Sequence, residues 1–550
     1  YGAVGTTPAP FFELNADQAT AFQTVREALD RSAYRAFLLE GVTGSGKTEI
    51  YLHAVRETLA AGRDCLVLVP EIALTAAIVE RFRSRFGDQV AVLHSGLSEG
   101  ERFDEWSRVH GGRARIVIGA RSAVFAPLRR LGLVVVDEEH DASYKQDEAP
   151  RYHGRDAALL RAYRAGAVAL LGSATPSLEA THNVAQGKLE RIVLPARISQ
   201  RPLPQVRIVG MHRTPRQPGS IMFSRQLVEA LRETLLAGDQ AILFLNRRGY
   251  AQLAHCTACK APVLCAQCSI SMTYHHVERR LQCHRCDYTR PLPVRCPQCA
   301  AQAMEIVGIG TERIEQEVGV IFPQARVLRV DSDTLRRRGE LERMLRGIRE
   351  RAYDVIIGTQ ILSKGHDFPH ITLVGAVLAD VSLNLPDFRA AERTFQILTQ
   401  MAGRAGRGER PGRVLIQTYS ERHYALVHVA DHDSASFNAQ ELELRRDTNS
   451  PPWSSQVLVW VSSPRFEKAR ALAGEAATAL RRVSRPEVTL LGPAEAPIAK
   501  LHNRYRWMIL LRAPSMARIQ PMLHAVLAEG ALKIGAKERI AVDVDPYNLL

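Results

Sequence analysis

Residues 36–48 read AFLLEGVTGSGKT, an apolar run that enters a glycine-rich turn and ends in Lys47 and Thr48. A helical pattern, TEIYLHAVRETL, overlaps its end. This order of strand, GxxxxGK[ST] turn and helix predicts a phosphate-binding P-loop, because glycines let backbone N–H groups close around phosphate oxygens. We expect Lys47 to reach the β- and γ-phosphates of ATP and Thr48 to bind Mg²⁺. The predicted nucleotide contacts are Gly41, Thr43, Gly44, Ser45, Gly46, Lys47 and Thr48.

Short apolar runs alternate with helical stretches in two series. Between Leu14 and about Pro195 the runs are AFLLEG, CLVLVP, VAVLHS, RIVIGA, LGLVVVDE and AVALLGSAT. Such Val, Leu and Ile runs, separated by helices, predict a parallel sheet covered on both faces. A second series, QAILFLNRRG, RVLRVDSD, DVIIGTQ, TLVGAVLAD and GRVLIQT, predicts another. We therefore expect an α/β fold with two parallel-sheet lobes.

Changes in residue composition and in the strand–helix pattern along the sequence predict the domain boundaries. The Pro-rich segment 194–204 reads as a linker, a cysteine-rich segment interrupts the second series, and a strand–helix pattern of a different kind begins after about His432. We expect the first lobe at 1–195 and the second lobe at 196–250 and 305–432. The insertion is then 251–304, and a small α+β domain follows at 433–550.

An acidic group ends the strand LGLVVV, about ninety residues after the P-loop. Asp137 and Glu138 stand where a P-loop enzyme needs a carboxylate for Mg²⁺ and a base for the attacking water, so we interpret the pair as a Walker B motif. A solvated acidic turn is the alternative for DEEH taken alone. The run GSATP at 172–176 ends the next strand and could link the nucleotide site to a nucleic-acid face. For this run taken alone, an ordinary turn at the end of a strand is the alternative.

Two arginines follow Gln400 in the run QMAGRAGR at 400–407. An arginine supplied across a cleft neutralises charge on the transferring phosphoryl group, which is worth about 10³–10⁵ in rate in known NTPases. Arg404 and Arg407 are therefore candidate catalytic residues beside Lys47, Asp137 and Glu138.

The order of GVTGSGKT, DEEH, GSAT, GTQ–KGHDF and QMAGRAGR resembles superfamily 2 helicases, whose two RecA-like lobes hold ATP between them. Within that superfamily the chain is similar to the PriA family of bacterial replication-restart helicases. The resemblance implies that Gln18 reads adenine and that Gly365 and Asp367 belong to motif V. Either Arg404 or Arg407 could be the arginine finger, and the resemblance favours Arg407.

The segment 144–153, YKQDEAPRYH, looks like the aromatic-rich loop that such helicases place after Walker B. Rings and cations in one loop can stack bases and pair phosphates, at about 1–3 kcal/mol per stacked base. A solvated polar loop is the alternative. The predicted DNA contacts are Tyr144, Lys145, Arg151, Tyr152 and His153.

Eight of the nine cysteines form four CxxC units within 44 residues, and Cys65 stands apart in an apolar run as an expected inert thiol. Two CxxC turns complete a closed tetrahedral site, so four units predict two structural Zn²⁺ ions rather than disulfides or a catalytic metal. Spacing alone leaves the pairing open. The resemblance implies nesting: Cys256, Cys259, Cys296 and Cys299 on one zinc, and Cys265, Cys268, Cys283 and Cys286 on the other.

Bulk composition favours a nucleic-acid partner. The net charge is +14 at 46% hydrophobic content, and we find no apolar run long enough for a membrane span. Residues 500–518 mix five cations with Tyr505 and Trp507, which suits single-stranded DNA, although an amphipathic strand is an equal alternative. The chain opens at Tyr1, and we expect the fork-binding N-terminal domains of the family to be missing.

The resemblance implies an ATP-dependent 3′→5′ DNA helicase that acts at stalled or repaired forks and starts primosome assembly. We expect ATP, Mg²⁺ and two Zn²⁺ as cofactors. Branched and single-stranded DNA, the single-stranded DNA-binding protein and primosome proteins are the expected partners of a cytoplasmic, nucleoid-associated monomer. Two alternatives remain: a restart scaffold that does not depend on ATP, and a duplex translocase without strand separation.

Overall fold

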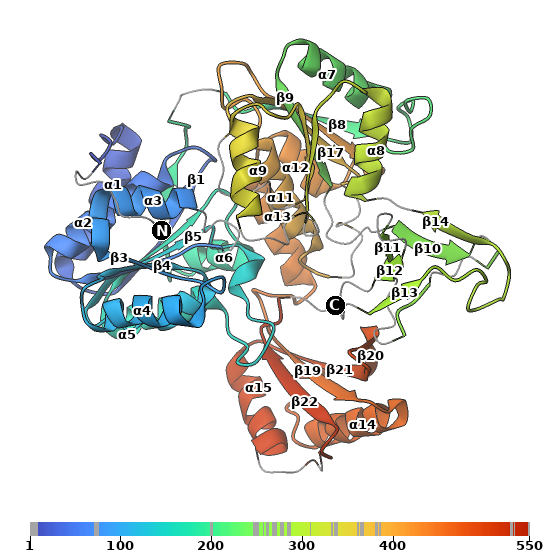
Figure 1. Ribbon diagram of the computed structural model, residues 1–550. Coiled ribbons are helices and arrows are strands. Elements are labelled where there is room, and N and C mark those ends of the chain that lie inside the picture. The colour runs from blue at the N-terminus through green and yellow to red at the C-terminus, as the bar shows by residue number, and fades with distance from the viewer. Residues whose placement is uncertain are drawn as a thin grey trace.

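A computed structural model of the 550-residue chain describes four parts (Figure 1). The described residues are 9–70, 76–198, 202–245, parts of 252–307, 310–331, 339–359, 368–379, 387–528 and 534–547, with single positions between them.

Lobe 1 is a parallel seven-stranded sheet with the order β3-β4-β2-β5-β6-β1-β7. Alternate residues of strands β1 to β6 enter two cores: Phe37 and Leu39 pack under α1–α3, whereas Leu38 packs under α4–α6. The elements are β1 (Arg35–Gly41), β2 (Asp64–Leu68), β3 (Val90–Leu93), β4 (Ile116–Gly119), β5 (Leu131–Asp137), β6 (Val168–Ser173) and β7 (Glu190–Leu194), with α1 (Ala16–Arg31), α2 (Lys47–Ala60), α3 (Ala76–Phe86), α4 (Glu99–His110), α5 (Gly154–Ala165) and α6 (Leu178–Ala185).

Lobe 2 is a second parallel sheet, of six strands in the order β15-β16-β9-β17-β18-β8. Helices α7 and α8 cover one face, and α9 with α11–α13 cover the other. The elements are β8 (Gln205–Gly210), β9 (Gln240–Leu245), β15 (Val327–Val330), β16 (Val355–Gly358), β17 (Ile371–Val377) and β18 (Arg413–Thr418), with α7 (Arg225–Leu236), α8 (Thr311–Ile321), α9 (Glu340–Arg349), α11 (Ala390–Ala402), α12 (Tyr424–Ala430) and α13 (Ser434–Asp447).

The lobes differ from the expected scheme at their edges. Strand β7 pairs with β1, and β8 pairs with β18. The expected division after residue 432 falls inside lobe 2, because the ring of Phe437 on α13 stacks on Phe395 of α11 with centroids 4.0 Å apart. The fold class itself, with two RecA-like lobes, a cysteine-rich region and a small C-terminal domain, is confirmed.

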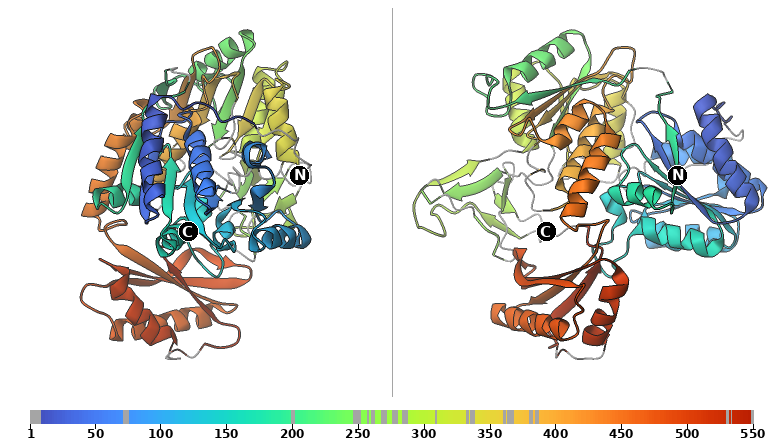
Figure 2. Two further views of the ribbon diagram at one scale, coloured as in Figure 1. Left: turned by 90° about the vertical axis from the view of Figure 1, so that its left-hand side faces the viewer. Right: turned by 180° about the vertical axis from the view of Figure 1, so that it is seen from behind.

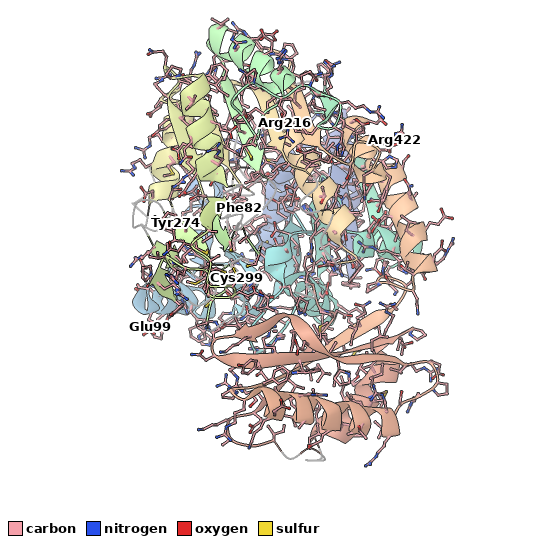
Figure 3. The ribbon with its side chains drawn as sticks, turned by 90° about the vertical axis from the view of Figure 1, so that its right-hand side faces the viewer. Phe82, Glu99, Arg216, Tyr274, Cys299 and Arg422 are labelled. Atoms are coloured by element: carbon pink, nitrogen blue, oxygen red, sulfur yellow. The ribbon has the colours of Figure 1, made fainter. Side chains whose placement is uncertain are left out.

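The cysteine-rich insertion contains an antiparallel sheet in the order β13-β12-β11-β10-β14. Its last strand pairs with its first strand at Leu253–Cys256, so the insertion extends to Val307 rather than 304. Figure 3 shows this sheet, with Tyr274 and Cys299 labelled, on one side of the molecule. The strands are β10 (Gln252–Cys256), β11 (Thr273–His275), β12 (Arg280–Gln282), β13 (Thr289–Pro291) and β14 (Met304–Val307).

The C-terminal domain lies below both lobes in Figures 1 and 2. It is an antiparallel sheet in the order β20-β21-β19-β22, with α14 and α15 against one face. Lys500 Nζ donates to the carbonyl oxygen of Ala266 at 2.8 Å, which joins this domain to the insertion. The elements are β19 (Ser455–Ser463), α14 (Phe466–Arg482), β20 (Thr489–Leu501), β21 (Arg504–Ala513), α15 (Met516–Leu523) and β22 (Arg539–Val544).

Two further expectations concern single features. Cys65 is fully buried in lobe 1, and burial raises the pKa of its thiol, as expected for an inert side chain.

Among the described helices, none combines the length and the apolar character needed to cross a bilayer.

Candidate nucleotide site and metal centre

The P-loop joins β1 to α2 at the carboxyl edge of the lobe 1 sheet. Gly44 and Gly46 have φ values of +90° and +83°, a backbone region in which other residues are strained. Lys47 Nζ donates to the carbonyl oxygen of Gly41 at 2.8 Å, so the ammonium group is held over the loop. The predicted strand–loop–helix context of the nucleotide contacts is therefore present.

Gln18 lies against this loop, although it is distant in sequence. Asn15 and Gln18 form a capping box at the start of α1, which fixes the Gln18 side chain. Its Nε2 atom then donates to the carbonyl oxygen of Ser45 at 2.9 Å. A Cβ atom at Gly46 would lie 2.2 Å from that nitrogen, so glycine is required there.

The hydroxyl of Ser45 supports a fit to phosphate. Ser45 is 2% exposed, and its Oγ atom has no hydrogen-bond partner among the described residues. An unpaired buried hydroxyl is costly unless a ligand supplies the partner. With the α2 N-terminus and Lys47 beside it, this loop is suited to a triphosphate.

Asp137 ends β5 directly beside the P-loop. Its Oδ1 atom accepts a hydrogen bond of 3.0 Å from the hydroxyl of Tyr51 on α2. A Cβ atom at Gly172 would lie 1.6 Å from the same hydroxyl, so that glycine makes room for the contact. Burial, together with the neighbouring Glu138, raises the pKa of Asp137 to about 6. A carboxylate held at this energetic cost is suited to a cation.

Glu138 adopts a left-handed backbone conformation with φ of +47°. A residue other than glycine in this region costs about 1–3 kcal/mol, and such strain is common at functional sites. The conformation turns the chain sharply after β5. Glu138 Oε2 then accepts a hydrogen bond of 3.2 Å from Nε2 of Gln400, which belongs to lobe 2.

The same amide of Gln400 reaches the ring of His140. Its Nε2 atom lies 2.9 Å from His140 Nε2, and His140 Nδ1 lies 2.7 Å from Ser173 Oγ. A proton on Nδ1 satisfies both contacts, because the ring then donates to Ser173 and accepts from Gln400. A continuous polar chain therefore runs from Glu138 through lobe 2 and back to the GSAT segment of lobe 1.

The two lobes approach closely around motif VI. A Cβ atom at Gly403 would lie 2.8 Å from Oγ1 of Thr43 in the P-loop. Arg197, after β7, donates to the carbonyl oxygens of Gly403 and Gly406 at 3.4 and 3.5 Å. Arg404 is 6% exposed, and Arg407 Nε donates to the carbonyl oxygen of Gly403 at 3.0 Å. Both arginines therefore lie at the segment that contacts the P-loop. Gly365 and Asp367 lie outside the described residues.

Three of the five side chains predicted to contact DNA are enclosed in the loop after Walker B, and this corrects that part of the predicted DNA site. Tyr144 is fully buried, and its hydroxyl donates to the carbonyl oxygen of Asp137 at 2.6 Å. Lys145 is 4% exposed and pairs with Asp543 at 2.8 Å. His153 is also largely enclosed, and burial lowers its pKa to about 4, so the ring is neutral. These three side chains do not offer a surface for DNA in this conformation.

Arg151 and Tyr152 remain accessible in that loop. The ring of Tyr152 makes an edge contact with Phe125, which is 65% exposed, at 5.0 Å. Arg151 lines a cavity of about 650 Å³ between this loop and the C-terminal sheet. The cavity residues that can recognise a polyanion are Arg151, Trp460, Arg504, Arg506 and Arg539.

For residues 500–518 the structure favours the amphipathic strand over the alternative of a DNA contact by Tyr505 and Trp507. Tyr505 and Trp507 contact Phe466 on α14, with centroids 5.6 and 6.1 Å away, on the helix-covered side of the sheet. Trp460 lies on the open side, with the guanidinium of Arg506 4.2 Å from its ring centroid. The alternation of β19 was the available signal, because Val459 and Val461 are both buried.

The four outer cysteines converge in the insertion. The thiols of Cys256, Cys259, Cys296 and Cys299 all lie within 4.8 Å of one another. Backbone N–H groups of Gln298 and Cys299 lie 3.3 and 3.5 Å from Cys296 Sγ, and they lower the pKa of that thiol to about 7. This set fits a tetrahedral thiolate-bound metal. Cys265 is buried nearby, whereas Cys268, Cys283 and Cys286 lie outside the described residues.

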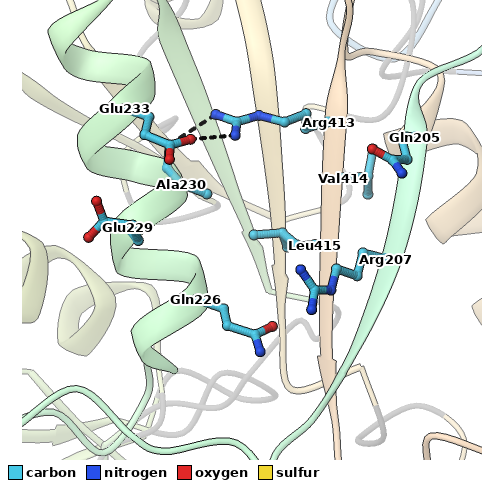
Figure 4. Close-up of a pocket in the computed structure, with 9 residues that line it drawn as sticks. All are labelled: Gln205, Arg207, Gln226, Glu229, Ala230, Glu233, Arg413, Val414 and Leu415. Carbon is cyan, nitrogen blue, oxygen red and sulfur yellow. Dashed lines mark hydrogen bonds and ion pairs between the residues drawn. The ribbon is translucent and has the colours of Figure 1, made fainter.

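A further cavity, of about 370 Å³, lies between α7 and strands β8 and β18 (Figure 4). Arg413 and Glu233 form an ion pair of 2.5 Å at its wall. None of the residues that line it belongs to the P-loop, Walker B or motif VI segments. We therefore do not assign it to the nucleotide site.

Comparison with known proteins gives consistent matches. Residues 15–184 match the DEAD/DEAH box helicase family, 265–291 match the PriA DNA helicase Cys-rich region, and 446–547 match the primosomal protein N C-terminal domain. The chain is 44% identical to the replication restart protein PriA of Bacillus subtilis, over 99% of the chain and 68% of that protein. The values for Synechocystis are 43%, 100% and 66%, and for Treponema pallidum 41%, 98% and 80%.

The raised pKa of Asp137 predicts a stability effect in the metal-free protein. The pKa of Asp137 is about 6 in the folded protein, whereas its usual value, expected in the unfolded chain, is 3.8. Ionisation of this carboxyl group therefore destabilises the fold fully above about pH 6 and not at all below pH 3.8. Asp137→Asn should raise the free energy of unfolding by about 1–3 kcal/mol near pH 8, and the gain should shrink as the pH falls toward 4. Urea denaturation in EDTA measures it, with exposed Asp30→Asn as the control. A gain that is independent of pH would contradict this account.

Proposed function

The chain belongs to the PriA family of replication restart helicases, and we propose that it couples ATP hydrolysis between its lobes to 3′→5′ movement along DNA. It is a DNA helicase by family. Polarity and stimulation of the ATPase by DNA are our proposals. They rest on the family likeness and on the arrangement of the site.

The residues of the cleft divide the chemistry among them. We infer that Gln18 and the P-loop bind ATP, that Lys47 neutralises its outer phosphates, and that Thr48 and Asp137 hold Mg²⁺. The metal, when bound, supplies charge neutralisation at the phosphates. Glu138 orients the attacking water and accepts its proton. Arg407, with Arg404 beside it, stabilises charge on the transferring group.

One observation supports this proposal most strongly: the amide of Gln400 contacts both Glu138 and His140. The base that would activate water in lobe 1 is thus positioned by a side chain of lobe 2. Movement of one lobe against the other would change that contact. ATP hydrolysis and movement of the lobes are therefore linked through the side chains of Gln400 and Glu138.

We propose that DNA contacts the cavity between the post-Walker B loop and the C-terminal sheet. Arg151, Arg504, Arg506 and Arg539 can pair phosphates, and Trp460 can stack a base. Asp147 and Glu148 line the same cavity and would limit how closely a backbone approaches. Among the rings that were predicted to contact DNA in the loop after Walker B, Tyr152 is the one that we propose as a contact.

Two zinc ions are proposed for the insertion. The outer thiol cluster fits the first ion, and Cys265, Cys268, Cys283 and Cys286 are proposed for the second by family likeness and spacing. With all ligand positions closed by cysteine, both ions would be structural. Since the insertion touches the C-terminal domain through Lys500, it would also brace the DNA-binding face.

The wider role is proposed from the relatives. They are replication restart proteins, and the chain spans about two thirds of the Bacillus subtilis and Synechocystis proteins. We propose action as a monomer on branched and single-stranded DNA of the nucleoid. The single-stranded DNA-binding protein and primosome proteins would be its partners.

Lys47→Ala tests the motor directly. Loss of the charge at the outer phosphates should lower DNA-stimulated kcat by at least about a hundredfold and abolish strand displacement on forked DNA. Lys188→Ala, at an exposed position of lobe 1, is the matched control. Intact unwinding by Lys47→Ala would refute the motor. Retained loading of the replicative helicase without unwinding would favour the scaffold alternative, and ATP turnover without strand displacement by the unaltered protein would favour the translocase.

Counting bound zinc tests the insertion. The purified chain should hold about two Zn²⁺, and Cys299→Ser should hold about one, because one ligand of a closed four-cysteine site is lost. Cys65→Ala is the control, since that thiol lies in lobe 1. A stoichiometry of one or zero in the unaltered chain would contradict the proposal of two sites.

A further inference from the structure

The segment Asp543–Tyr547 lies where the C-terminal domain meets both lobes. It comprises the end of β22 and the residues that follow it. Asp543 also lines the cavity proposed above for DNA, together with Arg539 of the same strand. One short segment therefore connects that cavity to the junction between the lobes.

Lobe 1 holds the first half of this segment through Lys145. The ammonium group donates to the carbonyl oxygen of Val544 at 2.7 Å and forms an ion pair with Asp543 Oδ1 at 2.8 Å. Lys145 is 4% exposed, so the pair is shielded from solvent. If β22 moved away from lobe 1, the buried charge of Lys145 would lose its partner. The free-energy cost of that loss opposes the movement.

Tyr547 holds the second half at the junction of the lobes. Its hydroxyl donates to the carbonyl oxygen of His140 at 2.8 Å. Its ring lies 4.8 and 4.9 Å from the guanidinium carbons of Arg389 and Arg393, at and near the start of α11, and Arg393 also donates to its carbonyl oxygen. Burial raises the pKa of the phenol, so the hydroxyl keeps its proton.

The two anchors of Tyr547 are parts of the catalytic junction. His140 stands two residues after Glu138 and contacts Gln400 through its ring. Helix α11 contains Gln400, and its Glu392 accepts from the backbone N–H of Leu178 at 3.0 Å, across the lobe interface. Arg389 pairs in turn with Glu179 of lobe 1 at 2.6 Å. A shift of Tyr547 would therefore act on both sides of the cleft.

We propose that Tyr547 is a positioning residue that makes ATP turnover depend on the placement of the C-terminal domain against the motor. A DNA strand that binds in the adjacent cavity displaces β22 and with it the segment Asp543–Tyr547. The hydroxyl of Tyr547 passes that movement to the loop that holds Glu138. The inference rests on the proposed function, because it concerns the same hydrolysis. It adds a residue of the C-terminal domain to the control of that site.

Tyr547→Phe is the deciding variant, since it removes the hydroxyl and keeps the ring against the two arginines. Loss of one buried hydrogen bond should lower DNA-stimulated kcat by about three- to tenfold. The KM for ATP should stay within about twofold of the unaltered chain, because no nucleotide contact is altered. The rate without DNA should fall less than the DNA-stimulated rate, because the hydroxyl passes on a movement that DNA causes. Tyr547→Ala should lose the same rate and also need more DNA for half-maximal stimulation, because the ring contacts are gone.

The measurement is steady-state ATP hydrolysis by the full chain, with and without an oligothymidylate. Tyr163→Phe, on a tyrosine that is 64% exposed, is the control. Native DNA-stimulated kcat in Tyr547→Phe would overturn the inference, as would an equal fall of the rates with and without DNA, which would indicate a structural role alone. If the unaltered chain shows no DNA-stimulated hydrolysis, the proposed function itself fails, and the two failures are thereby distinguished.

Discussion

The amide of Gln400 between Glu138 and His140 is the contact on which the arrangement of this protein depends. It joins an acidic group at the end of β5 to helix α11 of the other lobe. Its two N–H groups meet a carboxylate and a ring nitrogen, and Ser173 completes the chain on the far side of the ring. Because buried polar groups are costly without partners, this set favours one relative position of the lobes. Glu138 is held in a strained backbone conformation at the same place.

Small residues make that position possible. Gly403 lets the end of α11 approach Thr43, and Gly172 lets Tyr51 reach Asp137. Larger side chains at either position would separate the groups that have to meet. The ion pairs around the junction, including that between Arg445 and Glu392 at 2.7 Å, are buried and mutually paired. A buried ion pair adds little net stability by itself, because the cost of desolvating both charges offsets their attraction. The C-terminal domain reaches the same junction through Tyr547.

Much of the fold could be predicted from local pattern. The central strands of both lobes are continuous apolar runs, and the P-loop and Walker B segments stand at their ends, so type and order followed from the sequence. Edge strand β7 was missed because its burial alternates and its run is short. The division after residue 432 was misplaced because the stacking of Phe437 on Phe395 is a contact between distant segments. Tyr144 was taken for a surface ring, since nothing local shows that its hydroxyl meets a backbone carbonyl of β5. Pairwise contacts of this kind leave no periodic signal in one sequence.

A double-mutant cycle on His140→Ala and Gln400→Ala tests the central claim, that the lobes act as one catalytic unit through this contact. The quantity to measure is kcat of ATP hydrolysis in the presence of single-stranded DNA. Each single variant should lower it by at least about tenfold, and the double variant should be no slower than the slower single one, with a coupling of about 1–3 kcal/mol. Effects of the two substitutions that add in free energy would contradict the account, because the two side chains would then act independently.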